Sequence, residues 1–394
     1  RNLMNRVAVT GIGVVAPGAV GVDAFRSLLA GGRTAITEVD RFDVEGLRGR
    51  HAALVRDFNA RDFIAPMKMR RMNVLSRLSV AAAKMAFEDA PPVDPATTGV
   101  AIGTAFGPVQ TSVDYMREYV EKGASLAPPQ LFAESVANAP GSHIAIEWGL
   151  RGFNVTVTQR ESSALAAAMH GASQIVKGAV TAAVIGGVEE VNEMIFSVLD
   201  RLGSLGNESR PFDRRRAGLV PGEGSAMLIA EAEGREAYGY LAGFGIARDT
   251  TATISNWGDD PHAVVTAMRG AMDDADLTMR DIDAIYASAN STRRADCVEY
   301  RAIQELFGAA APPVVATKGY FGEYAAGGAL QLVAALLAID DQTLHPSCGF
   351  EEGDAEMCID VVRERRPAPL RNVLVNSISA GGGIVCAVVS REAA

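Results

Sequence analysis

The sequence has few of the residues that build metal sites or disulfide frameworks. Its 394 residues include four cysteines and five histidines. The cysteines show no CxxC spacing, and the histidines form no HxH or HxxxH pair. The sequence therefore predicts neither a disulfide scaffold nor a metal site, and we expect no bound cofactor.

Long apolar runs and an excess of positive charge are also missing. The longest apolar stretches, such as 330–339, are too short and too rich in alanine to span a bilayer. Residues 1–6 contain no apolar signal-peptide core and lead directly into a predicted strand, which indicates a cytoplasmic protein without a membrane anchor. Because 37 Lys and Arg stand against 47 Asp and Glu, the net charge of −10 disfavours a general nucleic-acid-binding protein.

Predicted strands alternate with predicted helices, and the second half of the chain repeats the order of the first. The helix-strand pair at 75–103 corresponds to the pair at 262–288, and the strand-helix pair at 155–176 corresponds to the pair at 314–339. This internal repeat predicts an α/β protein with two similar halves and helices packed between sheets. In such a fold the functional site commonly lies at loops where the halves meet.

The composition agrees with a large buried core. Hydrophobic residues make up 48% of the chain and charged residues 21%, which is typical of a soluble globular protein. The runs at 182–185 and 314–316 are apolar without alternation, as in strands buried on both faces. We place the boundary of the two halves between residues 1–240 and residues 241–394.

The segment 155–165 contains an acid at a position typical of a nucleophile. A short run rich in β-branched residues turns directly into the alanine-rich helical run 164–176, so we expect Glu161 on the connecting elbow or in the first helical turn. Such elbows often carry catalytic side chains, because the sheet holds the position and the helix dipole stabilises negative charge.

Five segments resemble, in family order, the thiolase-like β-ketoacyl synthase family over nearly the whole chain. The resemblance implies a thiolase-like fold in which duplicated α/β halves form a layered α-β-α-β-α core. The matching segments are RVAVTGIGVV at 6–15, SRPFD at 209–213, GLVPGEG at 218–224, ATKG at 316–319 and NSISAGG at 376–382.

The resemblance implies a reactive triad that this sequence lacks. Active members of the family use a cysteine on the elbow and two histidines from the second half. Glu161 stands at the cysteine position, Ser288 at the first histidine and Glu323 at the second. A carboxylate is a poor acyl acceptor, and serine with glutamate cannot replace two imidazoles. We therefore expect no condensation by this chain alone.

Other family positions are retained, which indicates a preserved scaffold. We expect Lys318 and Glu299 to form an ion pair that holds the loops of the second half. Ala380 replaces the phenylalanine that gates the site in the family, which puts that gate in doubt. The retained residues are Asp296, Glu299, Lys318, Asn376, Gly381 and Gly382.

A retained scaffold without the triad resembles the chain length factor, the ketosynthase β subunit of type II polyketide synthases. The resemblance implies a heterodimer with an active ketosynthase α subunit, which extends a polyketide on an acyl carrier protein whose phosphopantetheine arm visits the complex. Family members carry glutamine at the cysteine position, so the charge of Glu161 is a departure.

The resemblance also places part of the polyketide tunnel on the helix after the first glycine loop. Residues at helical spacing on one face are Val109, Ser112, Val113 and Met116. A stripe of this kind is more often plain core packing, and both interpretations stay open. Small residues at Ser112 and Val113 would permit a longer or bulkier chain.

Two other functions stay open. One is a stand-alone enzyme, such as a malonyl-carrier-protein decarboxylase, that uses Glu161 or Glu323 as acid or base. The other is a purely structural homodimer. For Glu161 itself, the alternatives are a first-turn acid without a chemical role and a carboxylate that binds Arg160 or partner groups at a dimer interface.

Overall fold

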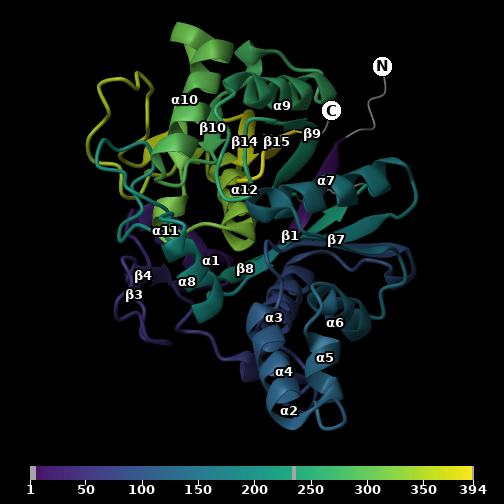
Figure 1. The fold of residues 1–394 in the computed structure, drawn as a ribbon. Helices are drawn as coiled ribbons and strands as arrows, with labels where there is room; N and C mark the ends of the chain where they lie inside the picture. The colour runs from purple at the N-terminus through teal and green to yellow at the C-terminus, as the bar shows by residue number, and fades with distance from the viewer. Residues whose placement is uncertain (1–5, 233–236, 393–394) are drawn as a thin grey trace.

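The computed structural model describes residues 6–232 and 237–392, and a mixed 11-stranded sheet runs through them (Figure 1). The short strand β2 (Ala19–Val20) pairs with β1 at the side of the main path. From one edge to the other, the main path contains β11 (Val314–Ala316), β10 (Ala284–Ala287), β14 (Asn372–Ile378), β15 (Gly383–Ser390), β9 (Gly239–Arg248), β1 (Val7–Ala16), β8 (Gly224–Glu231), β7 (Ala182–Glu189), β5 (Thr98–Gly103) and β6 (Asn154–Val157).

Helices and two small hairpins complete the described chain. The hairpins are β3 (Ile36–Glu38) with β4 (His51–Ala53), and β12 (Thr343–Leu344) with β13 (Arg366–Pro367). The helices are α1 (Val22–Gly31), α2 (Pro66–Met69), α3 (Val74–Asp89), α4 (Val109–Lys122), α5 (Pro129–Glu134), α6 (Ala139–Trp148), α7 (Ser163–Val176), α8 (Glu193–Arg201), α9 (Pro261–Asp274), α10 (Arg293–Phe307), α11 (Lys318–Phe321) and α12 (Ala325–Asp341).

The strand order confirms the predicted duplication. One half of the sheet reads β1-β8-β7-β5-β6, and the other half reads β9-β15-β14-β10-β11, which is the same arrangement. The halves join where β1 and β9 pair antiparallel, with Val7 opposite Leu241. The boundary that we place between residues 240 and 241 falls inside β9.

The layers follow from where the apolar surfaces lie. Helix α12 is apolar on all sides and packs against α7 and against strands of both halves, as expected for a helix inside the core. Helices α3 and α6 cover the outer face of the first half, and α9 and α10 cover the outer face of the second half (Figure 1). This is the predicted α-β-α-β-α layering.

Corresponding glycines let an outer helix approach each half of the sheet closely. A Cβ atom at Gly13 in β1 would lie 1.8 Å from the carbonyl oxygen of Ala82 in α3. A Cβ atom at Gly245 in β9 would lie 1.9 Å from the carbonyl oxygen of Ala267 in α9. No side chain fits at these distances, so the two halves share this packing device as well as their topology.

Within 6–232 and 237–392, no helix is both long and apolar enough to span a bilayer. In the same ranges, no group of three or more His, Cys, Asp or Glu side chains has a metal-binding arrangement.

Candidate functional site

The elbow after β6 is a short 3₁₀ turn, Arg160–Ser162, which leads directly into α7. Arg160 has a φ of 52°, a left-handed conformation that is uncommon outside glycine. The turn is held from the second half of the chain, because Ser162 N–H donates to the Ser379 hydroxyl at 2.9 Å and Ser377 Oγ donates to the Glu161 carbonyl at 3.1 Å. Glu161 therefore lies on the elbow, before α7 begins.

Glu161 is buried, which excludes the interpretation as an exposed helix-dipole acid. Its residue is 1% exposed, and its Oε2 accepts a hydrogen bond from Ala380 N–H at 3.1 Å. Its Oε1 has no hydrogen-bond partner among the described residues and lies 3.9 Å from Nη2 of Arg160. Burial raises the pKa of Glu161 to about 7, although Arg160 opposes the shift.

Ser288 and Glu323 are joined by one lysine. Lys318, the first residue of α11, donates from Nζ to the Ser288 carbonyl at 2.7 Å, and its Nζ lies 2.7 Å from Oε1 and 2.8 Å from Oε2 of Glu323. All three residues are at most 3% exposed. The charges of Glu323 and Lys318 also influence the pKa of Glu161. The three altered positions therefore lie in one buried cluster, in which Lys318 contacts Ser288 and Glu323.

The predicted ion pair between Lys318 and Glu299 is wrong. In the described chain, the ion-pair partner of Lys318 is Glu323, which lies five positions further along the same turn. Glu299 instead accepts hydrogen bonds from Ser288 N–H at 2.8 Å and Asn376 Nδ2 at 2.9 Å. Glu299 still holds the loop after β10, but through amide groups, and burial raises its pKa to about 7.

Asp296 and the two glycines hold neighbouring loops. The Asp296 carboxylate accepts hydrogen bonds from the N–H groups of Phe212, Asn290 and Ser291 at 2.8, 2.9 and 3.2 Å. Burial raises the pKa of Asp296 to about 6. Gly381 and Gly382 both have a φ of 87°, and their turn keeps Ala380 N–H directed at Glu161.

A further buried acid, Glu189, lies at the end of β7 and was not predicted from the sequence. Its Oε2 accepts a hydrogen bond from Ala105 N–H at 2.6 Å, and its Oε1 accepts one from Thr104 Oγ1 at 3.3 Å. Burial raises its pKa to about 8. The sequence feature that could have indicated this acid is the pair Glu189 and Glu190 at the end of an apolar strand.

The predicted stripe on α4 is only partly buried. Val109, Ser112 and Val113 are partly exposed, and Met116 is 53% exposed. Ser112 also donates a hydrogen bond from its hydroxyl to the Ser135 carbonyl at 3.3 Å, and α4 contacts α5. The stripe therefore lies partly against α5 and partly on the surface of this chain.

The three altered positions are enclosed by other parts of the chain. Glu161, Ser288 and Glu323 are buried, and the N–H groups and ammonium around them are already committed to internal oxygens. A carboxylate that is fully buried beside other carboxylates is a proton-binding group rather than an acyl acceptor.

Comparisons with known proteins agree across the chain. The family model described as Beta-ketoacyl synthase, N-terminal domain, matches residues 4–234, and the model described as Beta-ketoacyl synthase, C-terminal domain, matches residues 238–351. The tetracenomycin polyketide synthase ketoacyl synthase alpha and beta subunits of Streptomyces glaucescens are 32% and 30% identical, and each alignment covers 98% or more of this chain and 98% of the relative.

Two further relatives show the range of similar proteins. The 3-oxoacyl-[acyl-carrier-protein] synthase 2 of Vibrio harveyi is 27% identical over 96% of both chains. A solved structure of the ishigamide ketosynthase/chain length factor superposes with a TM-score of 0.92 at 28% identity, over 99% of this chain and 100% of that chain. The predicted thiolase-like fold is thereby confirmed.

Replacement of Glu161 by Gln should change the pH dependence of stability. The folded-state pKa of about 7 lies above the ordinary 4.5. The cost of the buried charge is therefore absent below about pH 4.5 and complete above about pH 7. We expect Glu161→Gln to stabilise the protein at pH 8 by about 2–3 kcal/mol more than at pH 5, measured by urea unfolding. The exposed Glu121→Gln should show no such difference, and an equal effect at both pH values would contradict a buried ionisable acid.

The Lys318–Glu323 pair should show strong coupling in a double-mutant cycle. Glu323→Gln leaves a buried ammonium without its counter-charge, so we expect a loss of about 3 kcal/mol in unfolding free energy. Lys318→Met with Glu323→Gln should lose clearly less than the sum of the single variants. The exposed pair Lys68 and Glu147, 2.8 Å apart, is the matched control and should contribute below about 1 kcal/mol. Additive effects at Lys318 and Glu323 would contradict this assignment.

Proposed function

Because the chain belongs to the β-ketoacyl synthase family, we propose that it is a catalytically degenerate ketosynthase β subunit, or chain length factor. It pairs with an active ketosynthase α subunit, which supplies the cysteine and the histidines. The pair condenses malonyl units on an acyl carrier protein, whose phosphopantetheine arm enters through the active partner. This chain shapes the tunnel in which the polyketide grows.

The observation that carries the proposal is that buried side chains of other types occupy the positions of the family's reactive residues. The positions of the nucleophile and of both histidines hold Glu161, Ser288 and Glu323, and each is at most 3% exposed in the chain without a partner. Glu323 is engaged by Lys318, and Glu161 by Ala380 N–H. A substrate thioester would meet charge and packed backbone here, so chemistry by this chain on its own has little support.

The surface supports a partner on the side of the first half. Strand β6 lies at the edge of the sheet and pairs on one side with β5, so its other side offers main-chain groups to a strand of another molecule.

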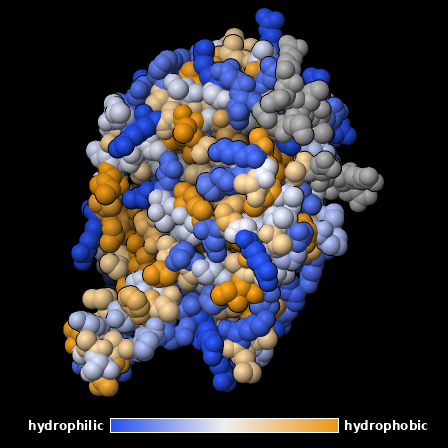
Figure 2. All heavy atoms as spheres, turned by 90° about the vertical axis from the view of Figure 1, so that its right-hand side faces the viewer, coloured by the Kyte–Doolittle hydropathy of each residue, from blue (hydrophilic) through white to orange (hydrophobic). Residues whose placement is uncertain are grey.

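Near the lower end of the molecule, where α4 and α5 lie, Figure 2 shows hydrophobic side chains on the protruding tip. Exposed apolar residues of this region are Met116, Val120, Leu126 and Phe132. A patch of this kind is typical of an interaction site.

The two alternatives have weaker support. A malonyl-carrier-protein decarboxylase would bring another carboxylate against Glu161, Glu189 and Glu323, all of which are buried. A purely structural homodimer would use the same exposed surface but would need no tunnel residues. Both alternatives predict that the chain works without a ketosynthase, which an experiment can test directly.

Co-expression with a ketosynthase that carries an intact Cys-His-His set tests the proposal. We expect a one-to-one complex that condenses malonyl units on acyl carrier protein, whereas the chain alone neither condenses nor releases CO₂ from malonyl carrier protein. Val120→Asp should reduce the copurified ketosynthase at least about fivefold, because it puts a charge into an apolar interface. Met279→Asp, at an exposed position of the second half, is the control. A stable homodimer that does not bind the ketosynthase, or CO₂ release by the chain alone, would contradict the proposal.

The tunnel role predicts a change in product length. Ser112 is a small, partly exposed residue on α4, and its hydroxyl donates to the Pro108 carbonyl at 3.1 Å. Ser112→Trp should fill space at this face and shorten the polyketide by one or more extension units, measured by mass spectrometry of the products of the complex. Glu118→Trp adds the same bulk to the opposite face of α4 and should leave the length unchanged. Unchanged length with Ser112→Trp, in a complex that still forms, would refute the tunnel role.

A further inference from the structure

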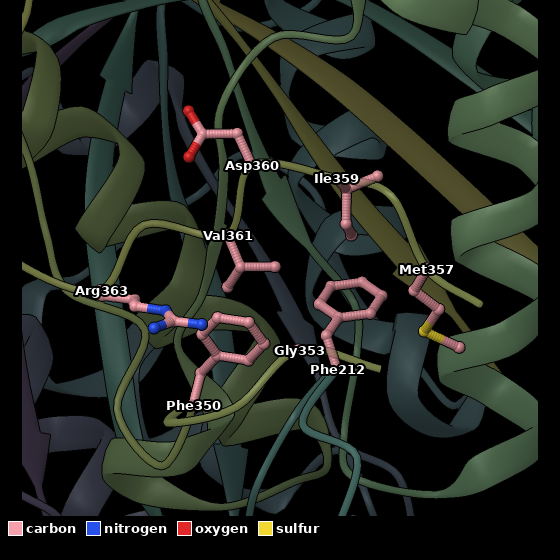
Figure 3. Close-up of a pocket in the computed structure, with 8 residues that line it drawn as sticks. All are labelled: Phe212, Phe350, Gly353, Met357, Ile359, Asp360, Val361 and Arg363. Carbon is pink, nitrogen blue, oxygen red and sulfur yellow. The ribbon is translucent and has the colours of Figure 1, made fainter. Parts of the chain in front are cut away.

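The second half of the chain has a pocket outside the buried set of acids. Its cavity of about 250 Å³ lies between Phe212 and the segment 350–363, which follows β12 and precedes β13 (Figure 3). The volume is slightly below the range of drug-sized ligand sites, about 300–1,000 Å³, so it suits a small molecule. None of the residues proposed for catalysis or for the tunnel lines it.

Aromatic and apolar side chains line this pocket beside polar groups, and part of its wall is held in place. Phe212 and Phe350 contribute aromatic rings, and Met357 and Val361 contribute buried aliphatic side chains. Phe212 is 1% exposed and has a φ of 61°, a conformation that needs support from its surroundings. The buried Asp296 carboxylate supplies this support by accepting the Phe212 N–H at 2.8 Å. One wall is therefore arranged before any ligand arrives.

The rim carries a positive charge without a counter-charge. Asp360 is neutralised by Arg366 at 2.8 Å, and in Figure 3 its carboxylate points away from the two aromatic rings. Arg363 lies across the ring of Phe350, with its guanidinium carbon 5.1 Å from the ring centroid. Within the described ranges, the Arg363 guanidinium forms no ion pair and no hydrogen bond. A free guanidinium beside an apolar pocket is complementary to an anion with an apolar body.

A second hollow continues from the rim. It has a volume of about 500 Å³ and shares Asp360, Val361 and Arg363 with the first pocket. Arg365, Arg366 and Glu364 also line it, so three arginines stand against two acids, Asp360 and Glu364, and Arg366 is paired with Asp360. The lining therefore carries a small excess of positive charge. A negatively charged ligand would be attracted to this entrance, and its apolar part would find the aromatic pocket next to it.

We propose that the pocket binds a small monocarboxylate with an aromatic or branched apolar group. The apolar group contacts Phe212 and Phe350, and the carboxylate binds the Arg363 guanidinium. One planar guanidinium fork matches the two oxygens of a carboxylate, whereas a phosphate dianion would need more positive groups at the same point. Because Asp296 also binds the N–H groups of Asn290 and Ser291, the pocket wall is joined to the loop that follows β10.

Phenylacetate is the probe that tests this site, with phenylacetamide as its neutral counterpart. In a ligand-observed NMR titration of the full chain, we expect saturable binding of phenylacetate and at least about fivefold weaker binding of phenylacetamide. Arg363→Gln should raise the Kd for phenylacetate at least about fivefold, since it removes the charged donor. Arg280→Gln removes the same charge at an exposed position that lines neither hollow, and it should change the Kd less than about twofold.

A second variant tests the apolar part. A Cβ atom at Gly353 would lie 3.8 Å from Cζ of Phe350, an ordinary contact, and Gly353 has no strained backbone, so Gly353→Leu should narrow the pocket without loss of thermal stability. We expect phenylacetate binding to disappear in this variant. No binding of phenylacetate to the native chain up to about 10 mM, or binding that survives both Arg363→Gln and Gly353→Leu, would overturn the proposal.

Discussion

The buried ammonium of Lys318 is the constraint around which the loops of the second half are arranged. A charge at this depth must be compensated, because its transfer from water into the interior costs several kcal/mol. Glu323 supplies the counter-charge, and the Ser288 carbonyl supplies a further acceptor. The ammonium thus joins the end of β10 to the turn after α11. With glutamate at position 323, the compensation is complete within one short turn, and Glu299 is left to bind amides.

Burial also explains why the altered site is a cluster of acids with raised pKa values. Removal from water raises the pKa of Glu161 to about 7 and that of Glu189 to about 8, while the ammonium of Lys318 is paired with Glu323. Carboxyl groups with pKa values of about 7 and 8 are partly protonated near neutral pH, which lowers the cost of their burial. Buried carboxyl groups at positions 161, 189 and 323 thus occupy this region of the core.

Much of the fold could be predicted from the sequence, because its determinants are local or periodic. The repeated helix-strand and strand-helix pairs lie within one or two residues of their predicted positions, and the strand order repeats as the internal repeat of the sequence predicted. The elbow position of Glu161 followed from an abrupt change of pattern. Helix α10 was missed because it is amphipathic and rich in charge, with no run of apolar residues, and β9 was missed because glycines interrupt it.

The electrostatic partners could not be predicted, because they depend on distances between segments far apart in the sequence. Two buried acids, Glu299 and Glu323, lie near Lys318. The geometry of the turn after α11 decides that Glu323 forms the ion pair. The burial of Glu189 depends on Ala105 N–H, 84 positions away. The partial exposure of the α4 stripe likewise depends on what packs against the helix, which periodicity alone does not specify.

The pairing of β1 with β9 has a consequence for how the protein unfolds. Main-chain hydrogen bonds cross from one half to the other at this pair, and α12 contacts strands of both halves. Removal of the first half would expose the apolar surface of α12, and removal of the second half would expose the strands β7 and β8 on which α12 packs. Either removal would open a new sheet edge in the middle of the molecule. The halves therefore resemble each other as products of duplication but form one cooperative unit. Neither half on its own should be a stable folding domain.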